Sequence, residues 1–174
     1  MIDAALIARF RADCAIDRDY GPPIGIAVSG GPDSLALLLL AHAALPGQVY
    51  AATVDHGLRA ESAAEAAFVA QVCRDLDVPH ATLPVRVEPG NTQAQARAAR
   101  YEALGSHFAN RNVLNFATAH HADDQAETLL MRLNRGSGVA GLAGVRPWSI
   151  FFPEGVVAEM LLLRPLLGWR REEL

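Results

Sequence analysis

Short apolar runs alternate along the chain with segments of helical pattern, and this alternation constrains the fold more than any other feature. Each run has the length and the β-branched or apolar composition of a buried strand. Strands that alternate with helices favour right-handed βαβ units and a mostly parallel sheet covered on both faces. The predicted strands are residues 24–28, 49–54, 80–85 and 113–118, and the predicted helices are residues 34–44, 60–76, 92–108 and 123–134.

The rest of the chain completes the expected organisation. Residues 156–163 have the pattern of a fifth strand and residues 170–174 that of a helix start, so we expect the domain to continue past Leu174. We predict a helical lead-in over residues 1–20 and one domain over residues 21–174. The expected fold class is α/β, a three-layer sandwich around a mostly parallel sheet of about five strands. Helix 60–76 is expected to bury one face, formed by Ala64, Ala67, Phe68, Val72 and Leu76.

Composition excludes several classes of function. All 15 basic residues are Arg, so neither a Schiff base nor a Walker-type phosphate-binding Lys is available. The 2 Cys residues form no Cys-x-x-Cys pair, and we expect both to be inert. A net charge of −4 does not indicate a strongly basic nucleic-acid binder, although residues 91–174 hold 9 Arg against 8 acidic residues. Without a signal peptide or an apolar run long enough to span a bilayer, the chain is predicted to be cytoplasmic, with no membrane partner.

The segment between the first strand and the first helix suits a phosphate group. Its two glycines allow a tight turn and a close approach of an anion, and the helix start offers free N–H groups. A carboxylate beside a phosphate repels it unless Mg²⁺ lies between them, so Asp33 predicts a magnesium-bound nucleotide. The alternative is a plain glycine turn in which Asp33 caps the helix. The segment consists of Ser29, Gly30, Gly31, Pro32, Asp33 and Ser34.

Further polar side chains follow the second and fourth strands, at what should be the same edge of the sheet. Asp124 and Glu127 are three residues apart on one helix face, where two carboxylates can hold an ammonium group or a metal, or simply complement the helix dipole. His120 and His121 are candidate ligands, acid–base groups or core histidines. The segment after the second strand contributes Asp55, His56, Gly57, Leu58 and Arg59.

Two pairs of arginines add positive charge near these groups. Arg97 and Arg100 are three residues apart on helix 92–108, and they form either a solvated face or a clamp on phosphate oxygens. Arg132 and Arg135 precede the glycine-rich residues 136–138. This basic segment suits a polyphosphate or an RNA backbone.

These segments together resemble a known family. Residues 29–34 resemble the PP-loop of the N-type ATP pyrophosphatases, whose fold is the Rossmann-like, adenine nucleotide alpha-hydrolase-like one. Residues 54–59, 96–101, 119–128 and 135–138 resemble specifically the tRNA(Ile)-lysidine synthase family, with the motifs in the expected order. The resemblance covers about residues 24–174.

The resemblance implies an ATP-dependent ligase that modifies tRNA. ATP adenylates the C2 oxygen of the wobble cytidine (position 34) of an unmodified tRNA(Ile), and pyrophosphate leaves. The amine of free L-lysine then attacks C2, releasing AMP and leaving lysidine. ATP and Mg²⁺ are the implied cofactors, with the phosphates on residues 29–34 and the metal on Asp33. The implied catalytic residues are Asp33, Arg97, His120, Asp124 and Glu127, and the implied lysine or tRNA contacts are His56, Arg59, Asp124, Glu127 and Arg135.

Three alternatives remain at this point. The chain could be another PP-loop ATP pyrophosphatase, or a non-catalytic ATP-binding module that never releases pyrophosphate. It could also be a metal-dependent phosphoesterase, which would use Asp33, Asp55, His56, His120, His121 and Asp123 as ligands. We further expect this chain to bind ATP without completing lysidine formation, because tRNA affinity needs many cationic contacts to phosphate.

Overall fold

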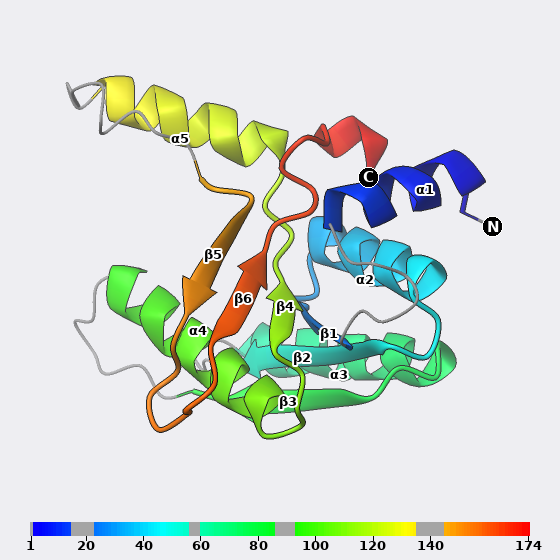
Figure 1. The fold of residues 1–174 in the computed structure, drawn as a ribbon, viewed down its shortest axis with the longest axis vertical. Helices are drawn as coiled ribbons and strands as arrows, with labels where there is room; N and C mark the ends of the chain where they lie inside the picture. Colours follow the sequence, from blue (N-terminus) through cyan, green and yellow to red (C-terminus); the bar gives the residue numbers. More distant parts are fainter. Residues whose placement is uncertain (1, 15–22, 56–59, 86–92, 135–144) are drawn as a thin grey trace.

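The computed structural model describes residues 2–14, 23–55, 60–85, 93–134 and 145–174 and contains one six-stranded sheet (Figure 1). The strand order is β3-β2-β1-β4-β6-β5. The strands are β1 (Ile24–Ala27), β2 (Val49–Asp55), β3 (His80–Pro84), β4 (Asn115–Ala117), β5 (Trp148–Phe151) and β6 (Met160–Leu163). The helices are α1 (Ala4–Cys14), α2 (Pro32–Ala44), α3 (Ala60–Asp75), α4 (Gln93–Ala109), α5 (Ala122–Asn134) and the 3₁₀ helix η2 (Arg171–Glu173).

The predicted α/β class and the mostly parallel sheet are confirmed, with one strand more than expected. Among the described strands, β5 alone runs antiparallel, pairing with β6 at the edge of the sheet. This strand escaped prediction because it is only four residues long and lies between Pro147 and Pro153. Its partner β6 begins at Met160, later than predicted, because Val157 lies in the exposed connection between the two strands.

Helices cover both faces of the sheet and make three layers. One hydrophobic cluster joins α1, α2 and α3 to β1 and β2, with Phe10, Leu37 and Val69 among its buried members. A second cluster joins α4 to the opposite face through Leu104 and Phe108. By contrast, α5 buries none of its own residues and extends beyond the carboxyl ends of the strands (Figure 1). None of the described helices is both long and apolar enough to cross a bilayer.

The predicted buried face of α3 is wrong by a rotation about the helix axis. Phe68 is 53% exposed, and Ala64 and Ala67 are also exposed. The buried line consists instead of Ala66, Val69 and Cys73, while Val72 and Leu76 are partly buried beside the same cluster. An alanine-rich helix has no strong apolar periodicity, so several of its faces are equally apolar in the sequence. Packing against β2 and β3 selects the face that is buried.

Both cysteines lie in the core, as expected of residues without a chemical role. Cys14 and Cys73 are buried free thiols. Burial, with the charge of Asp13 as a smaller contribution, raises the pKa of Cys14 to about 12. Burial alone raises the pKa of Cys73 to about 11, so neither thiol forms the reactive thiolate at neutral pH.

The segment that follows β6 packs against α1 and holds this helix against the rest of the domain. Trp169 is fully buried, and its indole N–H donates a hydrogen bond of 2.7 Å to Oδ2 of Asp13. The Arg9 guanidinium lies over the Trp169 ring at 4.1 Å and pairs with Glu173 at 2.7 Å. The helix start predicted at residues 170–174 is only the single 3₁₀ turn η2.

One glycine sets how closely α4 approaches the sheet. A Cβ atom added at Gly25 of β1 would lie 2.7 Å from the Phe108 ring of α4. We therefore expect Gly25→Ala to destabilise the fold by about 1–3 kcal/mol, because the buried ring has to move. Urea unfolding measures the change. Gly168→Ala is the matched control, since its added Cβ would meet nothing within 4 Å; equal stability of the two variants would contradict this packing.

Candidate active site

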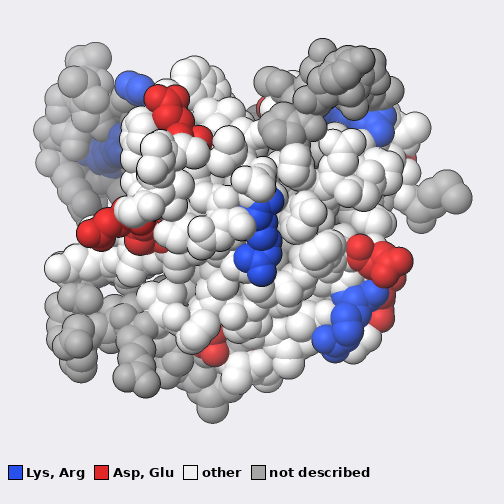
Figure 2. Space-filling model, turned by 60° about the horizontal axis from the view of Figure 1, so that its bottom comes forward, with Lys and Arg blue, Asp and Glu red and all other residues white. Residues whose placement is uncertain are grey.

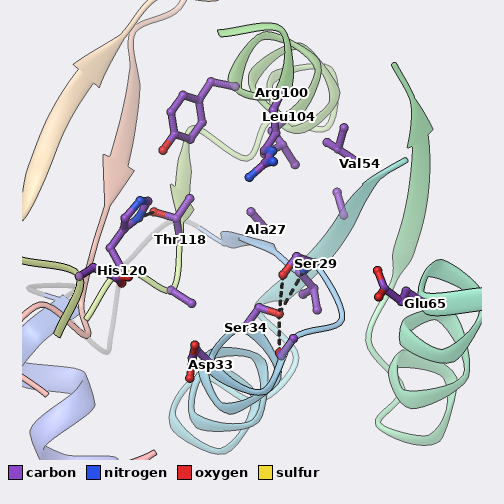
Figure 3. A pocket seen from close by; sticks show the side chains of 16 residues that line it. Ala27, Ser29, Asp33, Ser34, Val54, Glu65, Arg100, Leu104, Thr118 and His120 are labelled. Carbon is purple, nitrogen blue, oxygen red and sulfur yellow. Dashed lines mark hydrogen bonds between the residues drawn. The ribbon is translucent and has the colours of Figure 1, made fainter. Parts of the chain in front are cut away.

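A cavity lies where the strand order of the sheet reverses. β1 pairs with β2 on one side and with β4 on the other, and a crevice at such a switch point is the usual ligand site of open α/β sheets. The cavity has a volume of about 430 Å³ and opens at the carboxyl ends of these strands (Figure 3). Its apolar wall includes Ala27, Val54 and Leu104. Polar groups approach from the β1–α2 turn, from the end of β4 and from α4.

The predicted phosphate turn lines this cavity. Gly30 has φ +90°, a conformation that favours glycine, and Gly31 is the N-cap of α2 with Pro32 as the first helical residue. The Ser34 hydroxyl accepts a hydrogen bond from the Ser29 backbone N–H at 3.1 Å and donates one to the Gly31 carbonyl at 2.8 Å (Figure 3). The Ser29 and Ser34 hydroxyls, which lie 3.2 Å apart, therefore hold the turn itself together. The free N–H groups at the start of α2 are of the kind that can bind an anion.

Asp33 does not cap α2, so its carboxylate is available to contact other groups. Its Oδ1 lies 3.4 Å from Nε of Arg171, and its Oδ2 lies 3.5 Å from Nε2 of His121. Both contacts are longer than a good hydrogen bond, and the carboxylate lines the cavity beside the phosphate turn. Because Mg²⁺ in nucleotide sites commonly uses one or two carboxylates together with substrate phosphates, Asp33 fits the role of a magnesium ligand.

His120 follows β4 and is held from both sides of its ring. Its Nδ1 lies 2.9 Å from the Thr118 hydroxyl, and its Nε2 lies 3.1 Å from Nη2 of Arg97. An arginine only donates hydrogen bonds, so Nε2 must be the acceptor and Nδ1 carries the proton. Burial and the charges of Arg97 and Arg164 lower the pKa of His120 to about 4, although Asp124 opposes them. His120 is therefore a neutral imidazole at physiological pH.

The two arginines of α4 occupy different places. Arg100 lines the cavity opposite the phosphate turn (Figure 3). Arg97 lies at its edge, where Nη2 contacts both His120 and the Tyr101 hydroxyl, the latter at 3.1 Å. Of the two arginines that the sequence offers as a phosphate clamp, Arg100 lines the cavity and Arg97 does not.

The acidic pair at the start of α5 is divided between two environments. Asp124 lines the cavity, and its Oδ2 also accepts a hydrogen bond of 2.9 Å from the His121 backbone N–H, as a helix-capping residue does. Glu127 lies one turn further along α5 and is exposed, outside the cavity lining. The ammonium-binding and helix-capping interpretations of Asp124 are thus compatible, because one carboxylate oxygen suffices for the cap.

Two site residues were missed in the sequence, and three predicted ones cannot be placed. Glu65 of α3 lines the cavity. A Cβ atom added at Gly30 would lie 3.3 Å from the Cβ atom of Glu65. Arg164 directly follows β6 and is buried, and its charge helps to lower the pKa of His120. Since polar residues after strands mark this edge, Arg164 carried a usable signal. The predicted contacts His56, Arg59 and Arg135 lie outside the described residues.

The phosphoesterase alternative gains no support from the side chains that are described. Within residues 2–14, 23–55, 60–85, 93–134 and 145–174, no group of three or more His, Cys, Asp or Glu side chains is arranged to hold a metal ion. Asp33, His121, Asp123 and Asp124 do lie together, with carboxylate oxygens 3.5–3.7 Å from the nitrogens of the His121 ring.

A doubly wound sheet with a glycine-rich anion turn at its switch point defines a nucleotide-binding α/β protein. The PP-loop domain family matches residues 7–174, which is most of the chain. The chain therefore belongs to the PP-loop domain family. Membership in this family of ATP-binding domains implies that the chain binds ATP.

Curated relatives share about half of their length with this chain. A tRNA(Ile)-lysidine synthase of Novosphingobium aromaticivorans is 54% identical over 169 residues, which are 96% of this chain and 50% of the relative. A tRNA(Ile)-lysidine synthase of Zymomonas mobilis is 52% identical over 153 residues, 87% of this chain and 46% of the relative. The chain thus spans about half the length of the relatives it matches.

Solved structures of lower identity share the fold. The U34-tRNA thiolase NcsA from Methanococcus maripaludis, with its [4Fe-4S] cluster, superposes with a TM-score of 0.73 at 16% identity, covering 97% of this chain and 60% of the thiolase. The NH3-dependent NAD synthetase from Campylobacter jejuni, in complex with the nitrate ion, gives a TM-score of 0.59 at 15% identity, covering 97% of this chain and 67% of the synthetase. Both support the predicted fold.

The geometry of Gly31 allows a direct test of the phosphate turn. A Cβ at Gly31 would meet only the Ser29 hydroxyl, at 3.7 Å, so Gly31→Ala should leave the fold intact. The same methyl group would stand beside the N–H groups that are predicted to bind phosphate. We expect a loss of Mg-ATP affinity of about tenfold, or ~1.4 kcal/mol, in isothermal titration calorimetry. Gly168→Ala, remote from the turn, should bind normally; normal binding by both variants would place the phosphates elsewhere.

The low pKa of His120 predicts how stability depends on pH. The unfolded ring binds a proton near pH 6.5, whereas the folded ring binds it only near pH 4. Between these values the unfolded state holds more protons, so the free energy of unfolding falls as the pH drops from 6.5 to 4. His120→Gln removes this contribution, and its stability should decline less steeply over that window in denaturant titrations. Parallel declines for the variant and the wild type would show that His120 titrates normally.

Proposed function

We propose that this chain carries the nucleotide and lysine sites of an ATP-dependent tRNA(Ile)-lysidine synthase, which joins free L-lysine to C2 of the wobble cytidine of tRNA(Ile). The observation that carries the proposal is one cavity in which an anion-binding turn faces Asp124 and the neutral His120. Phosphates and a cationic amino acid need opposite charges within one site, and this cavity provides both. The names of the relatives that share half of their length with the chain support the same reaction.

In the proposed first step, the polyphosphate of ATP lies on the turn of residues 29–34. The N–H groups at the start of α2 and the Arg100 guanidinium would stabilise the negative charge of the pyrophosphate that leaves. Asp33 would hold Mg²⁺, which neutralises phosphate charge when it is bound. The C2 oxygen of the cytidine attacks the α-phosphorus, which forms the adenylated tRNA.

In the proposed second step, lysine replaces AMP at C2. Asp124 offers a carboxylate inside the cavity for an ammonium group of lysine, and Glu127 lies one helical turn away for the other end of the substrate. The attacking amine must lose a proton. That proton would pass to solvent, because Nε2 of His120 already accepts from Arg97 and a ring with a pKa of about 4 is a weak base.

The face of the molecule shown in Figure 2 does not account for the binding of tRNA. On the face shown in Figure 2, the arginines are scattered and interspersed with acidic side chains, and the described residues there form no continuous basic area. The net charge of −4 agrees with this picture. We therefore propose that much of the phosphate-backbone contact comes from regions outside the described residues, since RNA affinity rises with the number of cationic contacts.

Substitution of Asp124 separates the lysine site from the ATP site. Asp124→Asn keeps the shape and the capping oxygen but removes the charge that would hold an ammonium group. We expect lysine affinity, measured by calorimetry in the presence of Mg-ATP, to fall at least tenfold. Mg-ATP affinity should stay near normal. A variant that loses ATP affinity in a magnesium-dependent manner would assign Asp124 to the metal instead.

Asp123→Asn is the matched control, because Asp123 is the neighbouring acid and does not line the cavity. The reaction itself is tested by incubating the chain with Mg-ATP, lysine and unmodified tRNA(Ile) and assaying lysidine by nucleoside mass spectrometry. A chimaera carrying the second half of the Novosphingobium relative is assayed in parallel. Pyrophosphate release without lysidine in both proteins would favour another PP-loop reaction, and ATP binding without pyrophosphate release would favour a binding module.

A further inference from the structure

The main chain at Arg171 is held firmly against the start of α5. Trp169 is fully buried, and its indole N–H donates to Asp13 at 2.7 Å. The Trp169 carbonyl accepts a hydrogen bond of 2.9 Å from the Ala122 N–H. Two residues further on, the Arg171 N–H donates to Oδ2 of Asp123 at 2.8 Å. These contacts fix the backbone of residue 171 at the edge of the candidate active site.

The side chain of Arg171 is held much less firmly than its main chain. Its Nε lies 3.4 Å from Oδ1 of Asp33, which is longer than a good hydrogen bond, and 64% of the side chain is exposed. Exposed ion pairs of this kind contribute little to stability. The guanidinium can therefore leave Asp33 at little cost, while the backbone keeps it close by.

Asp33 requires a nearby cation if a polyphosphate is to bind beside it. Its carboxylate lines the cavity from the first turn of α2, where an uncompensated negative charge would repel phosphate. Two described groups face this carboxylate, Arg171 at Oδ1 and Nε2 of His121 at 3.5 Å from Oδ2. The His121 ring is shared with Asp123 and Asp124, whereas Arg171 carries a permanent charge. Arg171 is thus the group that balances the charge of Asp33.

We propose that Arg171 is a further phosphate-binding residue, which balances Asp33 before ATP binds and turns to the outer phosphates of ATP when that carboxylate is taken up by Mg²⁺. The proposal rests on the proposed function, which has the phosphates on residues 29–34 and the metal on Asp33. The guanidinium and the metal compete for one carboxylate, so binding of the metal frees the arginine beside the anion turn. Its forked donors match phosphate oxygens there.

The position of Asp33 in the cavity indicates which phosphates Arg171 would reach. In Figure 3, Asp33 lies on one side of Ser29, and the apolar side chains of Val54 and Leu104 lie on the other. A nucleotide with its base on this apolar wall and its phosphates on the turn has its outer phosphates nearest Asp33. Arg171, which contacts Asp33, is therefore assigned to the part of ATP that leaves as pyrophosphate.

The first test compares three ligands on Arg171→Gln, by calorimetry on the 174-residue chain with Mg²⁺ present. Glutamine keeps the backbone N–H that binds Asp123 but removes the charge of the side chain. We expect the affinity for ATP and for inorganic pyrophosphate to fall about tenfold. The affinity for AMP, which lacks the outer phosphates, should change by less than about twofold. Arg171→Lys keeps a charge without the fork and should lose less.

Arg170→Gln is the matched control, because Arg170 is the adjacent arginine and pairs with Glu172 at 3.4 Å instead of with Asp33. Both side chains of that pair are 74% exposed. The control should bind ATP, pyrophosphate and AMP as the wild type does.

The second test follows the arginine itself through its Nε–H resonance in ¹H–¹⁵N NMR, assigned by its loss in Arg171→Gln. Asp33→Asn removes the carboxylate charge and marks the position of the resonance when the arginine is released. Millimolar Mg²⁺ should move the wild-type resonance toward that position, and pyrophosphate added with Mg²⁺ should move it again. A resonance that stays at its ligand-free position when both are present would overturn the proposal.

The outcomes separate the role of Arg171 from the proposed reaction. Tighter Mg-ATP binding by Arg171→Gln would show that the arginine only competes with the metal, which would overturn the phosphate contact. Unchanged affinity for ATP and pyrophosphate, or an equal loss of affinity for AMP, would overturn it as well. If pyrophosphate affinity falls as expected but the wild type and its chimaera form no lysidine, the proposed reaction fails while the contact stands. If lysidine forms and Arg171→Gln binds normally, the contact alone fails.

Discussion

The parallel pairing of β1 with β2 on one side and β4 on the other is the constraint on which the rest of the structure depends. Because these strands run in the same direction, the segments that follow them meet at one edge of the sheet. The phosphate turn follows β1, and Thr118 and His120 follow β4. The close packing of Phe108 on Gly25 then brings α4, with its arginines, over the same edge. A loss of register at β1 would disperse all of these groups at once.

The segment after β6 contributes to the stability of the fold and also reaches the site. Trp169 and Glu173 fasten α1 to the body, while the Trp169 carbonyl accepts a hydrogen bond of 2.9 Å from the Ala122 N–H at the start of α5. The neighbouring Arg171 donates its backbone N–H to Asp123 at 2.8 Å and places its side chain near Asp33. The two acidic helix starts are therefore held by a stretch of chain that lies far from them in sequence.

Local chemistry made much of this predictable. The glycine turn, the helix starts and the short apolar strands depend on residues that are near neighbours in sequence. Their predicted positions agree with the structure to within a few residues. The edge strand β5 and the buried face of α3 depend on long-range packing, for which the sequence carries no short-range signal. Arg164 was a different case. Polar residues after the first, second and fourth strands were identified as functional, and the same criterion applied after Leu163 would have selected Arg164.

The distribution of charge around the cavity explains why one site can suit two substrates of opposite sign. Arg100 of α4 lines the cavity and Arg97 contacts His120 at its edge, whereas Asp33 and Asp124 line it from the starts of α2 and α5. His120 lies between the two groups, and because burial and the arginines keep it neutral, it adds no charge to either. A protonated imidazole there would repel a lysine ammonium group and would have no lone pair for the Arg97 donor. The neutrality of His120, which burial and the charges of Arg97 and Arg164 maintain, is therefore a condition for the proposed second step.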